Sequence, residues 1–234
     1  MPPAWSSSER AATGQYLTEV LADAVLFDLD GTLVDSTASV LRNWQRIATM
    51  LGREGEDLVG DRHGVPGRQV LRMVEPGLSE ERIRELDRAL IDGETADTRD
   101  VTATKGAIAL LEAIPPERWA IATSAPRRLA LARLRAAGLP VPAVLVTADD
   151  VRTGKPDPEP FRLAAEYLGR APERCLVVED APAGIEAARA AGCPVLGVLT
   201  TFPALDADTV DDLTGVTVDV TAAGLAVRYP SRRG

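Results

Sequence analysis

Residues 24–32 carry the stretch AVLFDLDGT, in which a short apolar run leads directly into two aspartates, a glycine and a threonine. The apolar run has the length and character of a strand that is buried on both faces. Because side chains alternate along a strand, Asp28 and Asp30 point to the same side, and Gly31 permits a sharp exit. Open α/β sheets place their sites beyond the carboxyl ends of such strands. The stretch therefore predicts a carboxylate site at a strand end rather than a solvated acidic loop.

Further apolar runs of the same kind follow along the chain, with helix-period segments between them. These runs cover residues 119–123, 143–147, 175–179 and 194–199. The helical segments between them end at Gly138, Gly169 and Gly192, a common stop for helices. Strands that alternate with helices form right-handed crossovers and a parallel sheet. The predicted fold class is α/β, with a Rossmann-like doubly wound parallel sheet.

The interval between the first two apolar runs is much longer than one crossover helix requires. It carries two amphipathic patterns, the second after the capping candidate Ser79, with apolar faces formed by Leu41, Trp44, Ala48 and Leu51 and by Ile83, Leu86 and Leu90. We therefore expect a helical cap domain at residues 35–105, inserted into a catalytic core at residues 23–34 and 106–234. Residues 1–22 are expected to form an N-terminal extension, with a weak helical pattern in residues 16–21.

The composition is that of an ordinary globular protein, with 45% hydrophobic and 26% charged residues in 234. A formal net charge of −9 disfavours nucleic acid and anionic membranes as main partners, because both need a basic face. Cys175 and Cys193 lack metal or redox spacing and are expected to be buried thiols in a reducing compartment. The sequence shows neither an apolar run of about 20 residues nor a secretory signal. A cytoplasmic protein, monomeric or weakly dimeric, is expected.

Three more polar features stand at the predicted strand ends or close to them. Thr123 and Ser124 end the second strand, Glu179 and Asp180 end the fourth, and Lys155 precedes a helix. Each has an ordinary interpretation, since the two pairs could cap helices and the lysine could be solvated. The chain has only two lysines beside many arginines, however, which favours a role for a compact ammonium group at residue 155. Together the features fall in strand order at one edge of the predicted sheet.

This combination resembles the haloacid dehalogenase superfamily, specifically its phosphatases of sugar and polyol phosphates with a small helical cap, in the β-phosphoglucomutase-like group. The resemblance covers about residues 24–200 and includes all four family motifs in order. It implies a sheet of strand order 5-4-1-2-3 with the strand that bears Asp28 at its centre. It also implies Mg²⁺ as the cofactor.

The resemblance further implies a role for each acidic residue at the strand ends. Asp28 is similar to the family's nucleophile, and Asp30 to its general acid/base. Asp180 is similar to the residue that binds Mg²⁺ together with Asp28 and the Asp30 carbonyl, with Glu179 assisting. Carboxylate oxygens suit Mg²⁺, and a divalent cation offsets the repulsion between a phosphate dianion and an attacking carboxylate.

By the same resemblance, Thr123 and Ser124 are expected to bind the phosphoryl group and Lys155 to neutralise its charge. Many relatives have asparagine where this chain has Ser124, but a hydroxyl can still donate there. Thr123 and Lys155 would stabilise the phosphoryl oxygens in a site from which the cap excludes water.

Residues 63–68 read HGVPGR and form a Gly/Pro-rich segment within the predicted cap. The segment includes His63, the only histidine, and Arg68. It is interpreted either as a plain turn between helices or as a specificity loop in which both side chains bind a polar substrate. A His-Gly step followed by an arginine resembles the cap loop of sugar-phosphate and glycerol-phosphate phosphatases.

We therefore expect a Mg²⁺-dependent phosphatase that hydrolyses a small sugar or polyol phosphate through an aspartyl-phosphate, with a small phosphorylated metabolite as its partner. The alternative is a sugar-phosphate mutase of the β-phosphoglucomutase kind. Such mutases usually carry a histidine on the first cap helix, where this chain has Val40. Three other functions are disfavoured. Dehalogenases lack the second aspartate, which this chain has as Asp30, and phosphonate cleavage needs a cap lysine, which residues 35–104 do not contain. A binding module that only keeps the fold would have lost a motif residue, and none is missing here.

Overall fold

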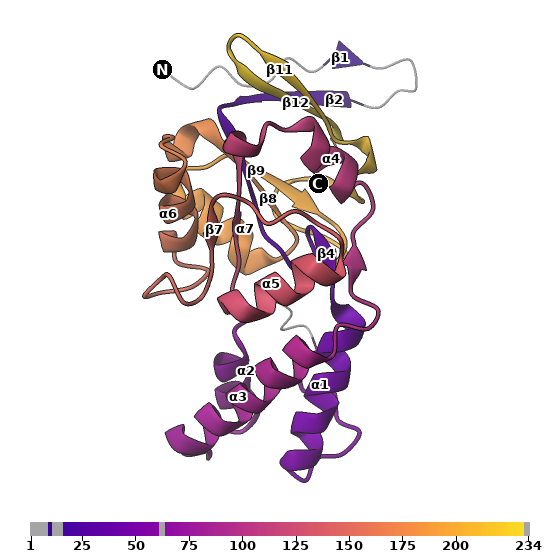
Figure 1. Cartoon of the computed structure of the whole chain (residues 1–234), viewed down its shortest axis with the longest axis vertical. Coiled ribbons are helices and arrows are strands. Elements are labelled where there is room, and N and C mark those ends of the chain that lie inside the picture. Colours follow the sequence, from indigo (N-terminus) through magenta and orange to yellow (C-terminus); the bar gives the residue numbers. More distant parts are fainter. Residues whose placement is uncertain (1–8, 11–15, 61–63, 232–234) are drawn as a thin grey trace.

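The computed structural model, which describes residues 9–10, 16–60 and 64–231, is built around a parallel sheet (Figure 1). Its strand order is β10-β9-β8-β3-β6-β7, and every neighbouring pair is parallel. The strands are β3 (Ala24–Phe27), β6 (Trp119–Ala122), β7 (Leu145–Val146), β8 (Cys175–Glu179), β9 (Val195–Val198) and β10 (Asp208–Val210). The predicted fold class and the order 5-4-1-2-3 are confirmed for the five apolar runs, and β10 adds an edge strand that the sequence did not predict.

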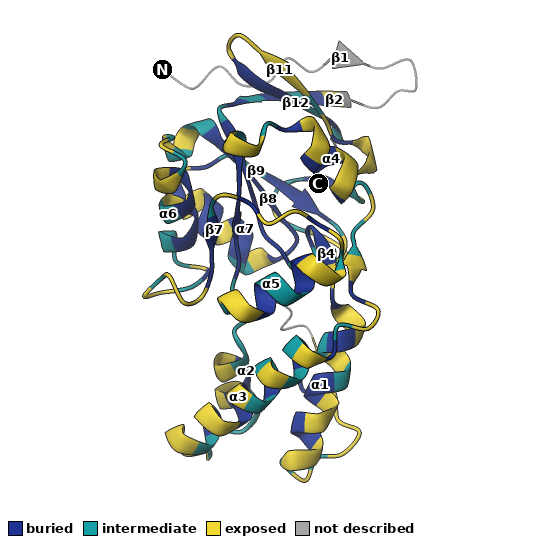
Figure 2. Ribbon diagram, viewed as in Figure 1, coloured by how far each residue is buried: buried dark blue, intermediate teal, exposed yellow. Residues whose placement is uncertain are grey.

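Helices cover both faces of this sheet, as the alternation of strands and helices predicts. The core helices are α4 (Ala107–Ala113), α5 (Arg127–Ala136), α6 (Glu159–Tyr167) and α7 (Pro182–Ala191), with short 3₁₀ turns at Pro116–Arg118, Pro172–Arg174 and Leu213–Gly215. Val25 and Phe27 of β3 pack with α4 and α5, whereas Ala24 and Leu26 pack with α6 and α7. The central strand is therefore buried from both sides (Figure 2).

A second sheet, antiparallel and of order β1-β2-β12-β11, lies at one end of the molecule (Figure 1). It consists of β1 (Glu9–Arg10), β2 (Tyr16–Ala22), β11 (Thr217–Thr221) and β12 (Gly224–Ser231). The weak helical pattern expected in residues 16–21 is wrong, because this segment is the strand β2. Burial there alternates with a period of two, with Thr18, Val20 and Ala22 buried and the residues between them more exposed.

The opposite end of the molecule is helical and consists of α1 (Thr37–Met50), α2 (Gly67–Val74) and α3 (Glu80–Ala96) (Figure 1). These helices share an apolar cluster that includes Trp44, Leu71 and Leu86. The Ser79 hydroxyl caps α3 by accepting a hydrogen bond from the Arg82 amide at 3.2 Å. We refer to residues 35–105, which contain these helices, as the cap.

The two connections between the cap and the core run side by side. Strand β4 (Val34–Asp35) pairs antiparallel with β5 (Thr102–Ala103), so the chain enters and leaves the helical region at one place. The Thr104 hydroxyl adds a hydrogen bond of 2.6 Å to the Thr32 carbonyl, directly after the Asp28–Asp30 segment. The base of the cap is thereby fixed close to the end of the central strand. Within the described residues, no helix is both long enough and apolar enough to cross a membrane.

Candidate active site

The polar residues that the sequence places at the strand ends line one cavity of about 370 Å³ between the core and the cap. Asp28 and Asp30 follow β3, and Thr123 and Ser124 follow β6. Glu179 ends β8 and is followed by Asp180, while Lys155 comes from the loop before α6. The parallel arrangement of the strands brings these residues together from positions up to 152 residues apart in the chain.

Lys155 is the centre of the polar contacts in this cavity. Its Nζ donates hydrogen bonds to Oδ1 of Asp28 and, at 2.7 Å, to Oε1 of Glu179, and its side chain is only 4% exposed. Although burial opposes the charge, the carboxylates of Asp28 and Glu179 raise the pKa of Lys155 above its ordinary value. Lys155 is therefore a buried, fixed ammonium group in the lining of the cavity.

Glu179 has both carboxylate oxygens engaged by donors of the protein. Oε1 accepts from Lys155, and Oε2 accepts from the Ala181 amide at 2.7 Å. The glutamate packs directly on Gly184 of α7, where a Cβ atom would lie 1.7 Å from Oε1. Glu179 is thus placed to orient the lysine.

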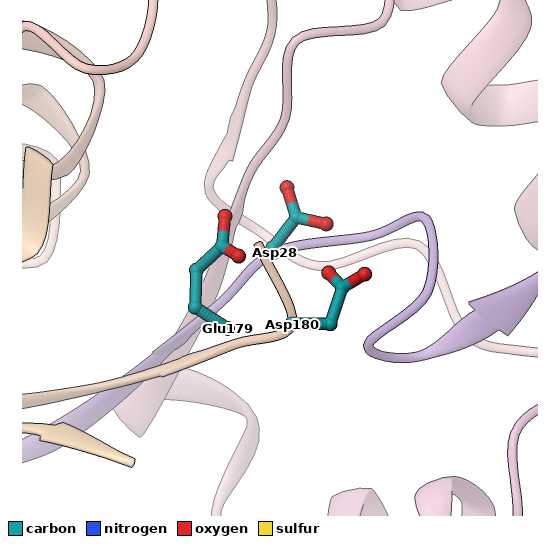
Figure 3. Close-up of side chains that lie close together, drawn as sticks. All are labelled: Asp28, Glu179 and Asp180. Carbon is teal, nitrogen blue, oxygen red and sulfur yellow. The ribbon is translucent and has the colours of Figure 1, made fainter. Parts of the chain in front are cut away.

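Asp28, Glu179 and Asp180 form a cluster of carboxylates in which one oxygen from each lies within 4.8 Å of the others (Figure 3). Burial raises the pKa of Asp28 well above its ordinary range, against the opposing effect of Lys155. Burial and the neighbouring Glu179 raise the pKa of Asp180 to about 7. Three buried carboxylates lie beside one ammonium group, so the cluster has excess negative charge when all three are ionised, and a cation would offset that charge.

The donor set of this cluster fits Mg²⁺, which takes oxygen ligands and is commonly bound by one or two carboxylates. The space beside Asp180 is kept open by Gly31, which has a φ of 87°. A Cβ atom at residue 31 would lie 2.0 Å from Oδ2 of Asp180 and 2.5 Å from Oγ1 of Thr201. Thr32 donates a hydrogen bond of 3.0 Å to Oδ1 of Asp180 and so fixes the carboxylate.

Asp30 lies on the side of the cavity that faces the cap. Its Oδ1 accepts a hydrogen bond from the Ser36 hydroxyl at 2.8 Å, and its Oδ2 accepts from Nη1 of Arg133 at 2.5 Å. Nη2 of Arg133 donates to Oε2 of Glu94, on the cap helix α3, at 2.6 Å. Burial raises the pKa of Glu94 to about 7, against the opposing effect of Arg133.

Sequence reasoning did not single out Arg133 and Glu94, although both line the cavity. A signal was present in each helix, because both residues fall on the apolar stripe. Arg133 follows Leu129 by four residues, and Glu94 follows Leu90 by four. A charged residue on a buried stripe is the exception that marks an internal contact.

Thr123 and Ser124 line the cavity at the end of β6, and neither of them caps a helix. The N-cap residue of α5 is Pro126, and the Thr123 hydroxyl instead accepts a hydrogen bond from the Ala125 amide at 3.1 Å. The interpretation of the Glu179–Asp180 pair as a side-chain cap of α7 is excluded in the same way, because Ala181 is the N-cap of that helix.

Of the two residues expected in a specificity loop, Arg68 lines the cavity, and His63 lies outside the described residues. Arg68 is in the first turn of helix α2 and not in a loop, since the helix begins at Gly67 after the extended Pro66. Its Nε donates to Oδ2 of Asp87 on α3 at 2.6 Å. Val40 also lines the cavity.

Comparison with known proteins places this chain in a family. The profile of the haloacid dehalogenase-like hydrolases matches residues 22–192. Hexitol phosphatase A of Escherichia coli K12 is 46% identical over 178 residues, which are 74% of this chain and 81% of that protein. Glycerol-1-phosphate phosphohydrolase 2 of Saccharomyces cerevisiae is 31% identical over 189 residues, which are 77% of this chain and 76% of that protein.

A solved structure has the same architecture. The crystal structure of a hydrolase from Pseudomonas syringae superimposes with a TM-score of 0.73 at 27% identity. The superposition covers 82% of this chain and 94% of that one. The matched profile ends at Gly192, before the β11–β12 hairpin that completes the antiparallel sheet.

Proposed function

The chain belongs to the haloacid dehalogenase-like hydrolases and is a phosphomonoesterase of that family. On that premise we propose that it hydrolyses a small sugar or polyol phosphate through a phosphorylated Asp28, with Mg²⁺ as its cofactor. The observation that carries the proposal is the contact of Asp28 with Lys155 beside Asp180, in a cavity that the cap covers.

The substrate class rests on the relatives and on the cavity. One relative is named as a hexitol phosphatase and another as a glycerol-1-phosphate phosphohydrolase. A cavity of about 370 Å³ is of the size that holds a small ligand. Its cap side includes the carboxylates of Asp87 and Glu94, which can accept hydrogen bonds from hydroxyl groups.

Asp28 is the proposed nucleophile. Lys155 holds Oδ1, which leaves Oδ2 to attack the phosphorus atom. A bond forms between Oδ2 and phosphorus while the bond from phosphorus to the ester oxygen breaks, and the alcohol leaves. Water then attacks phosphorus, releases phosphate and restores the carboxylate, so one difficult displacement becomes two easier ones.

Asp30 is the proposed general acid/base. It gives a proton to the departing alkoxide in the first step and takes one from the attacking water in the second. Its two oxygens each hold one hydrogen bond in the structure, from Ser36 and Arg133. Because a carboxylate oxygen has two lone pairs, one site on each oxygen remains for the proton.

The proposed phosphoryl site consists of Thr123, Ser124 and Lys155, whose donors stabilise the charge that develops on the phosphoryl oxygens. Asp28, Asp180 and the Asp30 carbonyl would hold Mg²⁺, which would supply the positive charge that lets a carboxylate approach a phosphate dianion. Glu179 acts through Lys155 in this proposal, because both of its oxygens are engaged by protein donors.

The proposal is tested by measuring phosphate release from a panel of phosphate esters with Mg²⁺ and with EDTA. We expect Mg²⁺-dependent release that is fastest with hexitol, sugar or glycerol phosphates. No release from any ester would refute the proposal. Interconversion of glucose 1-phosphate and glucose 6-phosphate without phosphate release would establish the mutase instead, although Val40 offers no proton for such chemistry.

A further inference from the structure

Arg133 connects the proposed general acid/base to the cap. It comes from the core helix α5, yet its guanidinium reaches Asp30 at 2.5 Å on one side and Glu94 of α3 at 2.6 Å on the other. In Figure 1, α5 lies on the side of the central sheet that faces the cap helices. The three side chains therefore form a continuous contact from the reaction site to the cap.

This contact is poorly explained by stability alone. The side chains of Arg133 and Glu94 are 5% and 8% exposed, so both charges have lost most of their hydration. Nε of Arg133 has no hydrogen-bond partner among the residues that the structure describes. Replacing a buried ion pair with apolar residues of similar volume often leaves a protein at least as stable. The buried charge of Arg133 therefore needs another reason, and its contact with Asp30 supplies one.

We propose that Arg133 is a positioning residue that holds the Asp30 carboxyl group toward the leaving group, and that Glu94 anchors Arg133 from the cap. The inference rests on the proposed function, because it assigns Asp30 the proton transfer. In this arrangement the acid is in place when α3 lies against α5. A small displacement of a proton donor weakens catalysis strongly, because the transfer needs hydrogen-bond distance.

The leaving group distinguishes this role from a structural one. A polyol alkoxide is a strong base and needs a proton as it departs, whereas a 4-nitrophenolate leaves without one. A misplaced acid therefore slows phosphoryl transfer from a polyol phosphate more than transfer from 4-nitrophenyl phosphate. The value to compare is kcat/KM, which reports the steps up to the phosphorylation of Asp28 and excludes the later hydrolysis that both substrates share.

The experiment compares Arg133→Met with wild type on sorbitol 6-phosphate, glycerol 1-phosphate and 4-nitrophenyl phosphate. General acid catalysis contributes about 10²–10⁴-fold, so we expect kcat/KM to fall about 10- to 100-fold with the polyol phosphates. With the aryl phosphate we expect a fall of less than about threefold, since its leaving group needs no acid. Arg133→Lys, which keeps one of the two contacts, and Glu94→Gln should show smaller losses with the same asymmetry.

Arg128 provides a matched control. It pairs with Asp92 between the same two helices, but the two side chains are 51% and 58% exposed and neither contacts Asp30. Arg128→Met removes a contact between cap and core without touching the acid, and it should leave both substrate classes within about twofold of wild type, as exposed ion pairs contribute little. Circular dichroism and thermal unfolding check that each variant is folded.

Equal losses on the aryl and polyol phosphates in folded Arg133→Met would overturn the proposal, and so would an equal asymmetry in Arg128→Met. If Arg133→Met does not fold, the same comparison is decided by Arg133→Lys and Glu94→Gln. Failure of the proposed function is a separate outcome. It would be seen as wild-type protein that releases phosphate from none of the three esters, or as undiminished release by Asp28→Asn.

Discussion

The buried carboxylates predict an unusual dependence of stability on pH in the metal-free protein. Burial and Glu179 raise the pKa of Asp180 to about 7, from an ordinary value of 3.8 that should hold in the unfolded chain. Between these values the folded state binds a proton that the unfolded state releases. The contribution of Asp180 to stability is therefore complete below pH 3.8 and is lost as pH rises to 7.

The magnitude follows from the interval between the working pH and the raised pKa. At pH 5 the carboxyl lies two units below its folded pKa, and each unit corresponds to about 1.4 kcal/mol. Asp180→Asn removes this titration and leaves the other carboxylates in place. The unfolding free energy of wild type, minus that of Asp180→Asn, should therefore fall by about 3 kcal/mol from pH 5 to pH 8. In a domain of this size the difference corresponds to roughly 6–12 °C in Tm.

The assay is denaturant unfolding of both proteins at several pH values, first in EDTA and then with Mg²⁺. A cation in the cluster would favour the ionised carboxylate, so Mg²⁺ should stabilise wild type more at pH 8 than at pH 5. Asp180→Asn should gain much less from Mg²⁺. A pH-independent difference between the two proteins in EDTA would refute the electrostatic account. Equal stabilisation of both proteins by Mg²⁺ would show that the ion does not bind at Asp180.

Three further substitutions test the site directly. Asp28→Asn should keep the fold and lose turnover, because an amide cannot take the phosphoryl group; phosphate release within tenfold of wild type would remove Asp28 as the nucleophile. A Cβ atom at residue 184 would lie 1.7 Å from Oε1 of Glu179, so Gly184→Ala should displace this side chain and lower Tm. Because Glu179 orients Lys155, kcat/KM should fall by at least about tenfold. Wild-type kinetics would show that Glu179 is not needed to orient Lys155. Arg68→Ala should raise KM for polyol phosphates and lower their kcat/KM about 10- to 100-fold, with aryl phosphate hydrolysis little changed. An equal loss of kcat/KM with polyol and aryl phosphates would assign Arg68 to cap folding.

The central strands and the polar residues at their ends could be predicted from the sequence, because unbroken apolar runs specify strands buried on both faces. Strand β2 could not be predicted in this way, because Leu17 and Leu21 are four residues apart, the spacing of one face of a helix. The strand became clear only from its pairing with β12, about 200 residues later in the chain. Strand β10 has three residues, too few for a periodic signal.

The cap side of the site was harder to predict for another reason. Glycine and proline dominate residues 64–67, and they concealed a helix that begins at Gly67 and carries Arg68. Arg133 and Glu94 are charged residues on the apolar stripes of their helices, a local signal that marks an internal contact but does not identify the partner. Their pairing depends on the docking of α3 against α5, a tertiary contact that no local pattern encodes.

The charges of the site also bear on the order in which ligands enter it. Asp28, Glu179 and Asp180 carry three negative charges when ionised, and Lys155 compensates one of them. Because burial raises the pKa of Asp28 and Asp180, the metal-free cluster favours protonation, whereas a divalent cation would keep the carboxylates ionised and neutralise their remaining charge of −2. With a cation there, a phosphate dianion would meet a neutral cluster and the donors of Thr123 and Ser124. The electrostatics of these residues therefore favour binding of the metal ion before the phosphate ester.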